Sequence, residues 1–245
     1  MAETIHFQTE TGTMRGWLAK PRAQNTKHPA VLVIHEAFGL AANIEPIVDR
    51  FAENGYVALA PDLFDKPEPK PLCVTKALLS MTTGKGEAIR DIDRALSYLA
   101  SLEEVDANRL AACGFCMGGG FALLLALEGV PGLEFSHRMN AVAPYYGSSP
   151  VFFPNAEKSC PVVAGFGKKD FVFSTVGDKI EKVLSEKGID HDVKTYPDAG
   201  HSYMTHEMPD ILYRMSKISP LRVGYRHDDA EDSWKRMLSF FAKHV

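Results

Sequence analysis

Apolar, strand-like runs alternate with helical patterns along most of the chain, and this alternation limits the possible folds more than any other feature. The runs at residues 30–34 and 162–166 are continuously apolar, and the run at 109–115 is apolar after Arg109, which is typical of strands buried on both faces of a sheet. Further strands are expected at residues 56–60, 141–145 and 191–196, and helices at residues 44–54, 86–102, 118–127, 178–187 and 230–243. The pattern predicts right-handed β-α-β crossovers and an α/β fold with a mainly parallel, twisted sheet and helices on both faces.

The beginning of the chain differs from the rest. Two β-leaning runs, residues 4–9 and 14–19, flank a short polar segment and predict an N-terminal β-hairpin. No convincing linker interrupts the chain, so residues 1–245 are expected to form one domain without a large lid. A cluster of lysines and prolines at residues 66–71 predicts an exposed loop.

Composition excludes several classes of partner. The chain has 27 basic and 31 acidic residues, a net charge of −4, so neither a nucleic acid nor an anionic membrane is an expected partner. Its beginning lacks the features of a signal peptide, and no apolar stretch approaches the ~18 residues of a membrane span. With four cysteines, too few for a disulfide scaffold, we expect a cytoplasmic protein with reduced thiols, a monomer or small homo-oligomer.

A candidate nucleophile follows the strand at residues 109–115. Cys116 lies between Gly114 and Gly118 in a Gly-x-Cys-x-Gly turn, and an apolar helix comes next. A tight strand-to-helix turn needs neighbours without bulk, and glycine meets that need. The N-terminus of the following helix favours the thiolate over the thiol. The pattern therefore predicts a reactive cysteine, although a buried and inert cysteine in a glycine-rich turn would have the same sequence.

Two more polar residues follow the next predicted strands. Asp170 comes after the strand at 162–166, and His201 comes after the strand at 191–196. The order nucleophile, acid, histidine matches that of α/β-hydrolases, in which the acid orients the imidazole and the imidazole takes the proton of the nucleophile. For the oxyanion hole we expect the backbone N–H groups of Met117 and Ala37.

Four segments of the chain resemble those of one known family. They are residues 114–119, residues 35–39 with Glu36, residues 145–147 and residues 200–202. Together they are similar to the dienelactone hydrolase (carboxymethylenebutenolidase) family of the α/β-hydrolase superfamily. The resemblance implies that Cys116 is the nucleophile, His201 the base and Asp170 its orienter, and that Glu36 holds or receives the thiol proton in the resting enzyme. It further implies hydrolysis of small lactones or carboxylic esters through a thioester, without a metal or an organic cofactor.

The chain departs from this family where the founding enzymes bind the carboxylate of their substrate with two arginines. Four residues after the histidine the chain has Thr205, and residues 66–88 contain lysines but no arginine in the corresponding segment. We expect an extra helix at residues 208–217. This segment would either cover the pocket and supply an arginine in place of the missing pair, or be a surface segment whose charges are solvated. The candidate substrate-binding residues are Phe38, Tyr145, Tyr203, Arg214 and Arg222.

Other interpretations compete with this one. Cys113 and Cys116 have the C-x-x-C spacing of a thioredoxin-like redox pair, although Cys113 falls within a predicted strand. A non-catalytic protein of the same fold is also conceivable, since a fold alone does not determine a function. Asp198 could replace Asp170 as the acid if Asp170 points away.

Overall fold

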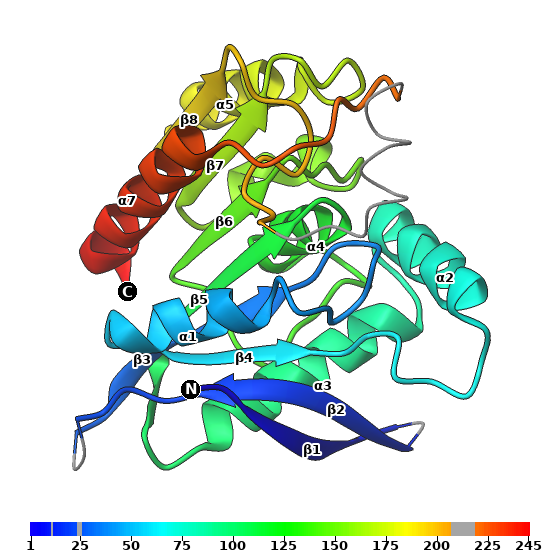
Figure 1. Cartoon of the computed structure of the whole chain (residues 1–245), viewed down its shortest axis with the longest axis vertical. Coiled ribbons are helices and arrows are strands. Elements are labelled where there is room, and N and C mark those ends of the chain that lie inside the picture. The colour runs from blue at the N-terminus through cyan, green and yellow to red at the C-terminus, as the bar shows by residue number, and fades with distance from the viewer. Residues whose placement is uncertain (11, 24–25, 207–218) are drawn as a thin grey trace.

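The computed structural model of the chain describes residues 1–10, 12–23, 26–206 and 219–245, and its centre is one eight-stranded sheet (Figure 1). The strands are β1 (Glu3–Thr9), β2 (Gly12–Ala19), β3 (His28–Ile34), β4 (Val57–Pro61), β5 (Val105–Phe115), β6 (Ala141–Tyr145), β7 (Val162–Gly167) and β8 (His191–Tyr196). The helices are α1 (Glu45–Glu53), α2 (Lys70–Thr83), α3 (Glu87–Ser101), α4 (Met117–Leu125), α5 (Val176–Lys187) and α7 (His227–His244), with a 3₁₀ helix, η1 (Phe153–Lys158). The strand order is β1-β2-β4-β3-β5-β6-β7-β8.

The sheet is parallel except at one edge. The predicted hairpin is present as β1 and β2, and β2 also runs antiparallel to β4. From β4 to β8 every neighbouring pair is parallel. The mixed sheet with helices on both sides confirms the predicted α/β class and its N-terminal hairpin.

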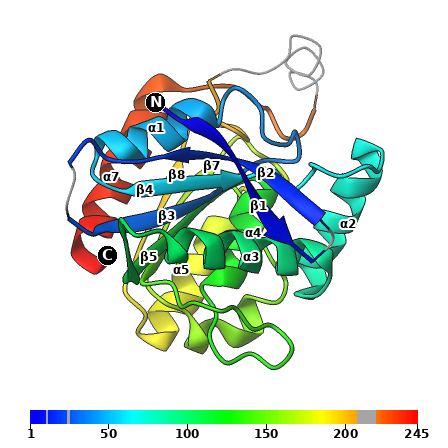
Figure 2. The same ribbon diagram turned by 90° about the horizontal axis from the view of Figure 1, so that it is seen from below.

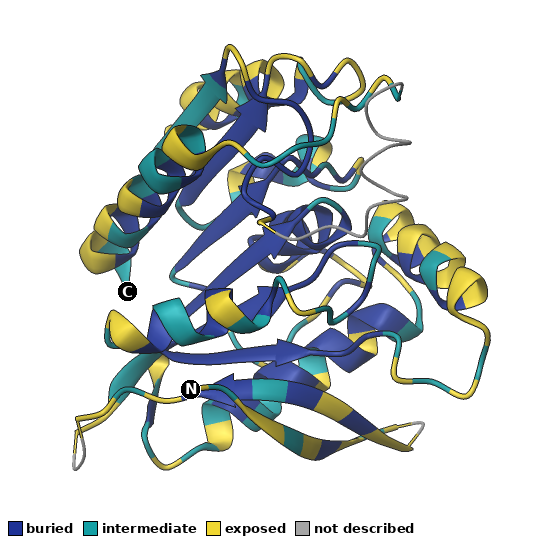
Figure 3. Cartoon of the chain, viewed as in Figure 1, coloured by how far each residue is buried: buried dark blue, intermediate teal, exposed yellow. Residues whose placement is uncertain are grey.

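Helices cover both faces of the sheet. Figure 2 shows α1 and α7 on one face and α3, α4 and α5 on the other. The side chains of β3 alternate between the two cores: Ala30, Leu32 and Ile34 pack with the helices α3 to α5, and Val31 and Val33 pack with α1 and α7. A strand that is buried on both faces needs an unbroken apolar run, and the central strands are accordingly buried in Figure 3.

Neither helix α2 nor the 3₁₀ helix η1 was predicted from the sequence, and α2 is the longer of the two. The helix begins at Lys70, inside the segment expected to be a loop, with Pro71 in its first turn. Proline is well suited to the first turn of a helix, so this residue is a start signal as well as a loop signal. The exposed Leu72 and Leu79 obscure the apolar stripe, and Figure 3 shows that much of this helix faces solvent.

The connections that follow β3 and β5 determine where a ligand can bind. The two strands are neighbours and parallel, but α1 covers one face of the sheet and α4 covers the other. Ligands of open α/β sheets bind at such a point, beyond the carboxyl ends of the strands. The segments that follow are residues 35–39 and Cys116. None of the helices in the described ranges is both long enough and apolar enough to cross a lipid bilayer.

Candidate active site

Cys116 lies in a tight turn between β5 and α4. Its φ of 54° and ψ of −115° are unfavourable for a residue with a side chain, and its N–H donates to the carbonyl of Tyr145 at 3.0 Å. A Cβ atom on Gly114 would lie 2.0 Å from the carbonyl oxygen of Gly118, and one on Gly118 would lie 2.1 Å from that of Ile34. The two glycines are therefore required by close packing. The turn places the half-buried thiol beside the N-terminus of α4.

Asp170 and His201 are brought together at the ends of β7 and β8. His201 Nδ1 donates to Asp170 Oδ2 at 2.6 Å, and the two side chains are 4% and 0% exposed. The second oxygen, Oδ1, accepts from the N–H groups of Val172 and Phe173 at 3.0 and 3.1 Å. Because both carboxylate oxygens are held, the proton of the imidazole is fixed on Nδ1 and Nε2 is left for another group.

The Nε2 atom of His201 lies near Cys116, and no described residue forms a hydrogen bond of normal geometry with it. Burial by itself would lower the pKa of His201. The negative charge of an ionised Cys116 and the hydrogen bond to Asp170 outweigh burial and raise this pKa to about 10. The ring therefore favours its protonated form when the sulfur beside it is a thiolate.

Glu36 lies in a buried cluster of hydroxyl groups. The residue is 1% exposed. Its Oε1 atom accepts hydrogen bonds from Ser202 Oγ at 2.7 Å and from Thr205 Oγ1 at 3.1 Å. Oε2 has no hydrogen-bond partner in the part of the chain that the structure describes. Burial raises the pKa of Glu36, against the opposing effects of the hydroxyl groups and of the nearby His201.

Three members of this cluster were not among the expected catalytic residues. Thr205, which stands where the family has an arginine, bonds Glu36 and lies 3.4 Å from the hydroxyl oxygen of Tyr146. The ring of Tyr146 packs on His201 with its centroid 5.0 Å away. Ser202 could have been found from its position directly after His201, in the same tight loop, where its φ is 54°.

The two expected oxyanion donors lie on adjoining segments. Residues 36–39 form a turn in which the N–H of Gly39 donates to the carbonyl of Glu36 at 3.0 Å. The N–H of Ala37 donates to no acceptor within the described ranges. Met117 begins α4, and the first N–H groups of a helix have no partner within it. The contact between Gly118 and the backbone of Ile34 brings the two segments against each other.

The expected substrate-binding residues are not all near this cluster. Tyr145 and Tyr203 instead belong to the core, where their hydroxyl groups bond the carbonyl and the side chain of Ser233 in α7 at 3.1 and 2.8 Å. Both tyrosines are fully buried, and so is Tyr146, which directly follows β6 with a φ of 40° and whose ring packs on His201. Phe38 is partly exposed in the turn after β3, and Arg222 is exposed. Arg214 and the helix expected at 208–217 lie outside the described residues.

The structure does not favour the competing interpretations. Cys113 is completely buried within β5, and burial raises the pKa of its thiol well above the ordinary value, which disfavours the thiolate that disulfide exchange needs. Asp198 is exposed and bonds Lys169 at 2.7 Å, away from the imidazole that Asp170 holds. Within the described ranges, no three histidine, cysteine, aspartate or glutamate side chains are grouped so that they could hold a metal ion.

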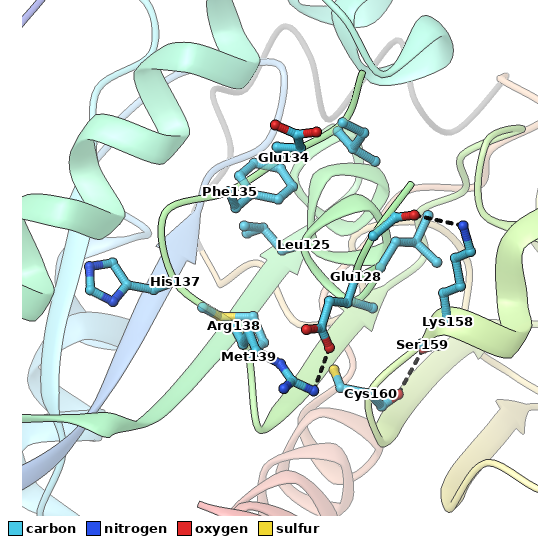
Figure 4. Close-up of a pocket in the computed structure, with 14 residues that line it drawn as sticks. Leu125, Glu128, Glu134, Phe135, His137, Arg138, Met139, Lys158, Ser159 and Cys160 are labelled. Carbon is cyan, nitrogen blue, oxygen red and sulfur yellow. Dashed lines mark hydrogen bonds and ion pairs between the residues drawn. The ribbon is translucent and has the colours of Figure 1, made fainter. Parts of the chain in front are cut away.

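A separate cavity of about 160 Å³ lies beyond the other end of α4 (Figure 4). Its lining includes Cys160, the ion pair of Arg138 with Glu128, and Lys158, which donates to the carbonyl of Gly129. Cys116 precedes the first residue of α4, and this cavity begins at its last residue, Leu125. The cavity therefore contains none of the expected site residues.

The dienelactone hydrolase family model matches residues 14–245, which include the turn at Cys116 and the Asp170–His201 pair. The chain belongs to the dienelactone hydrolase family. It is a hydrolase, of a family named for a lactone-cleaving enzyme.

Relatives of this dienelactone hydrolase family member cover almost the whole chain. It is 27% identical to "Protein usf" of Aquifex pyrophilus over the full length of both, and 28% identical to a Salmonella typhimurium protein named "Putative carboxymethylenebutenolidase", over 94% of this chain and 83% of that one. Its fold is similar to that of a dienelactone hydrolase-like promiscuous phosphotriesterase from metagenomic libraries, with a TM-score of 0.79, 24% identity, and coverage of 100% of this chain and 98% of that chain. The fold is thus the α/β-hydrolase fold.

Proposed function

We propose that the chain hydrolyses small lactones or carboxylic esters with Cys116 as nucleophile, through a thioester acyl-enzyme. The observation that carries this proposal is the buried Asp170–His201 hydrogen bond of 2.6 Å, with the free Nε2 of His201 near the sulfur of Cys116. A base that is oriented by a carboxylate and lies beside a thiol is the arrangement that nucleophilic catalysis requires.

In the proposed reaction His201 Nε2 takes the thiol proton, and the sulfur forms a bond to the carbonyl carbon of the substrate. The N–H groups of Ala37 and Met117 would bind the oxyanion of the tetrahedral intermediate. The carbon–oxygen bond of the ester then breaks, and the leaving oxygen takes the proton from His201. Water, deprotonated by His201, attacks the thioester, and the carbon–sulfur bond breaks to release the acid and the thiolate. The proton on His201 then returns to the sulfur, which restores the starting state.

Glu36 forms part of the proposed site as a buried carboxyl group near His201. Its raised pKa and the two hydroxyl groups on Oε1 support a role in holding a proton near Cys116 and His201 in the resting enzyme. A negative charge on Glu36 would also disfavour a thiolate beside it.

The substrate we propose is small and does not depend on an anionic group for binding. Thr205, at the family's arginine position, has an uncharged hydroxyl group that is already bonded to Glu36 and near Tyr146. It cannot form a salt bridge with a carboxylate. Phe38 is the remaining described candidate for an apolar contact beside the turn at 36–39.

The direct experiment is hydrolysis of p-nitrophenyl acetate by the full chain and by Cys116→Ala, with Cys160→Ala as the matched control. We expect a burst of nitrophenol from the wild type and from Cys160→Ala, and background release from Cys116→Ala. Mass spectrometry of the quenched wild type should find one acetyl group on the peptide that contains Cys116. Equal release from all three proteins would contradict the proposal.

A further inference from the structure

His35 is a completely buried histidine that the proposed reaction does not use. It lies directly after β3 and is 0% exposed. Its Nδ1 lies 2.7 Å from the carbonyl oxygen of Glu36, and its Nε2 lies 3.1 Å from the backbone nitrogen of Leu63, which follows β4. The ring of Phe64 packs edge-on against it, with centroids 4.9 Å apart. The side chain therefore connects the turn at residues 36–39 with the segment after β4.

The two partners allow only one protonation state of the ring. A carbonyl oxygen can only accept, so Nδ1 carries the proton and donates to Glu36. The N–H of Leu63 can only donate, so Nε2 is unprotonated and accepts. Burial lowers the pKa of His35, which favours the same neutral form. This imidazole is thus a fixed hydrogen-bond connector that has no free nitrogen for proton transfer.

The bond to Glu36 fixes the direction of the next N–H group. All the described peptide bonds are trans, so the carbonyl of Glu36 and the N–H of Ala37 point to opposite sides of one rigid plane. His35 and the N–H of Gly39 both hold the carbonyl on one side. The N–H of Ala37 must then point to the other side, and it has no acceptor within the described ranges.

We propose that His35 is a positioning residue, which orients the Glu36–Ala37 peptide so that the N–H of Ala37 can bind the oxyanion of the reaction. This inference rests on the proposed function, because it concerns the stabilisation of that reaction's tetrahedral intermediate. A donor helps the transition state only if its direction is set before the charge develops, since reorientation during the reaction costs free energy. Without His35, the carbonyl of Glu36 keeps only the bond from Gly39 within the described ranges, and the peptide plane is held less firmly.

The test compares His35→Leu with His35→Asn in ester hydrolysis. The amide nitrogen of asparagine can occupy the place of Nδ1 and donate to Glu36, whereas leucine fills space without a donor. We expect His35→Leu to lower kcat for p-nitrophenyl acetate by about 10²-fold, with KM almost unchanged, because an oxyanion contact is made in the transition state. His35→Asn should recover most of that loss.

A second readout separates positioning from general damage to the site. Alkylation of Cys116 by iodoacetamide occurs at a saturated carbon and forms no oxyanion, so His35→Leu should be alkylated at the wild-type rate. The matched control is His191→Leu, because His191 also bonds a backbone carbonyl, that of Ile189 at 2.7 Å, but lies on the edge strand β8. It should keep the wild-type values of both measurements.

Three results would overturn the inference: wild-type kcat in His35→Leu, a parallel loss of alkylation and hydrolysis, or failure of His35→Asn to recover activity although it folds. Folding of each variant is checked by its thermal unfolding temperature. If the wild type and Cys116→Ala hydrolyse the ester at the same rate, the proposed function itself is contradicted. This comparison is made before any His35 variant is measured, so the two failures can be told apart.

Discussion

The two ends of helix α4 each have a cysteine, charged side chains and a nearby histidine, but the charged side chains are buried at one end and exposed at the other. Before its first residue, Cys116 lies in a strained turn near the fully buried Asp170–His201 pair. Beyond its last residue, Cys160 lines the cavity of Figure 4, where the paired side chains of Arg138 and Glu128 are 78% and 52% exposed. Charges that solvent surrounds interact weakly, whereas buried and hydrogen-bonded charges shift one another's protonation.

In this molecule, the presence of a cavity beside a cysteine does not indicate that its thiol is reactive. At Cys160, burial raises the pKa of the thiol to about 12, against the weaker opposing effects of a backbone hydrogen bond and of the charge of Arg138. At Cys116 the helix begins one residue later and His201 lies beside the sulfur. Four experiments test this difference between the two cysteines and their surroundings.

The largest expected effect is on ester hydrolysis by the two cysteine variants. Cys116→Ala should lower kcat/KM by about 10⁴-fold or more, because it removes the nucleophile. Cys160→Ala should remain within about twofold of the wild type, since its sulfur contacts no member of the proposed site. Steady-state rates with p-nitrophenyl acetate measure both, and a comparable loss in both variants would end the contrast.

The next effect concerns the carboxylate that holds the imidazole. Asp170→Asn should lower kcat by about 10²- to 10⁴-fold, because the amide can present a donor to Nδ1 and so favour the wrong tautomer. Asp198→Asn is the matched control, since Asp198 is exposed and pairs with Lys169. Rates are measured from pH 6 to 9 for both variants. Unchanged activity in Asp170→Asn would show that another group orients His201.

Thiol labelling compares the two cysteines within one molecule. At pH 7, iodoacetamide should modify Cys116 at least about 10²-fold faster than Cys160, because a thiol with a pKa near 12 is almost entirely protonated. Peptide mass spectrometry over time gives both rates without any substitution. Similar rates at both positions would mean that the surroundings of Cys116 do not activate it.

The smallest expected effect is on stability, through the buried carboxyl group of Glu36. Its folded pKa lies above the ordinary value of 4.5, so the folded state holds this proton more tightly than the unfolded state. Stability should therefore fall as the pH rises from that value through the raised pKa, by about 1.4 kcal/mol per unit of elevation. Glu36→Gln cannot ionise and should lose less stability over this range.

Urea unfolding at several pH values between 4.5 and 8 measures this difference. Glu53→Gln, which changes an exposed glutamate of α1, is the control and should parallel the wild type. If the free energies of unfolding of the wild type and of Glu36→Gln differ by the same amount at every pH, Glu36 has an ordinary pKa in the folded protein.

Elements with a strong local pattern were predicted well. Strands β6 and β8 have the predicted bounds, and helix α3, Glu87–Ser101, lies within the range expected from its apolar stripe. The helix α2 was missed because its exposed leucines interrupt the stripe that burial of one face would produce. In the candidate site, the turn at Cys116 was predictable because close packing requires its glycines.

By itself the sequence determined the α/β order of elements, the glycine-flanked turn at Cys116, and the polar residues that follow β7 and β8, since hydrophobic period and turn chemistry are local properties. Only the tertiary structure decided that Tyr146 and not Tyr145 faces the site, and that Glu36 is bonded by Ser202, 166 residues away in the chain. It also gave His35 its two backbone partners. Hydrogen bonds of buried groups depend on which segments the fold places together, and no short stretch of sequence contains that information.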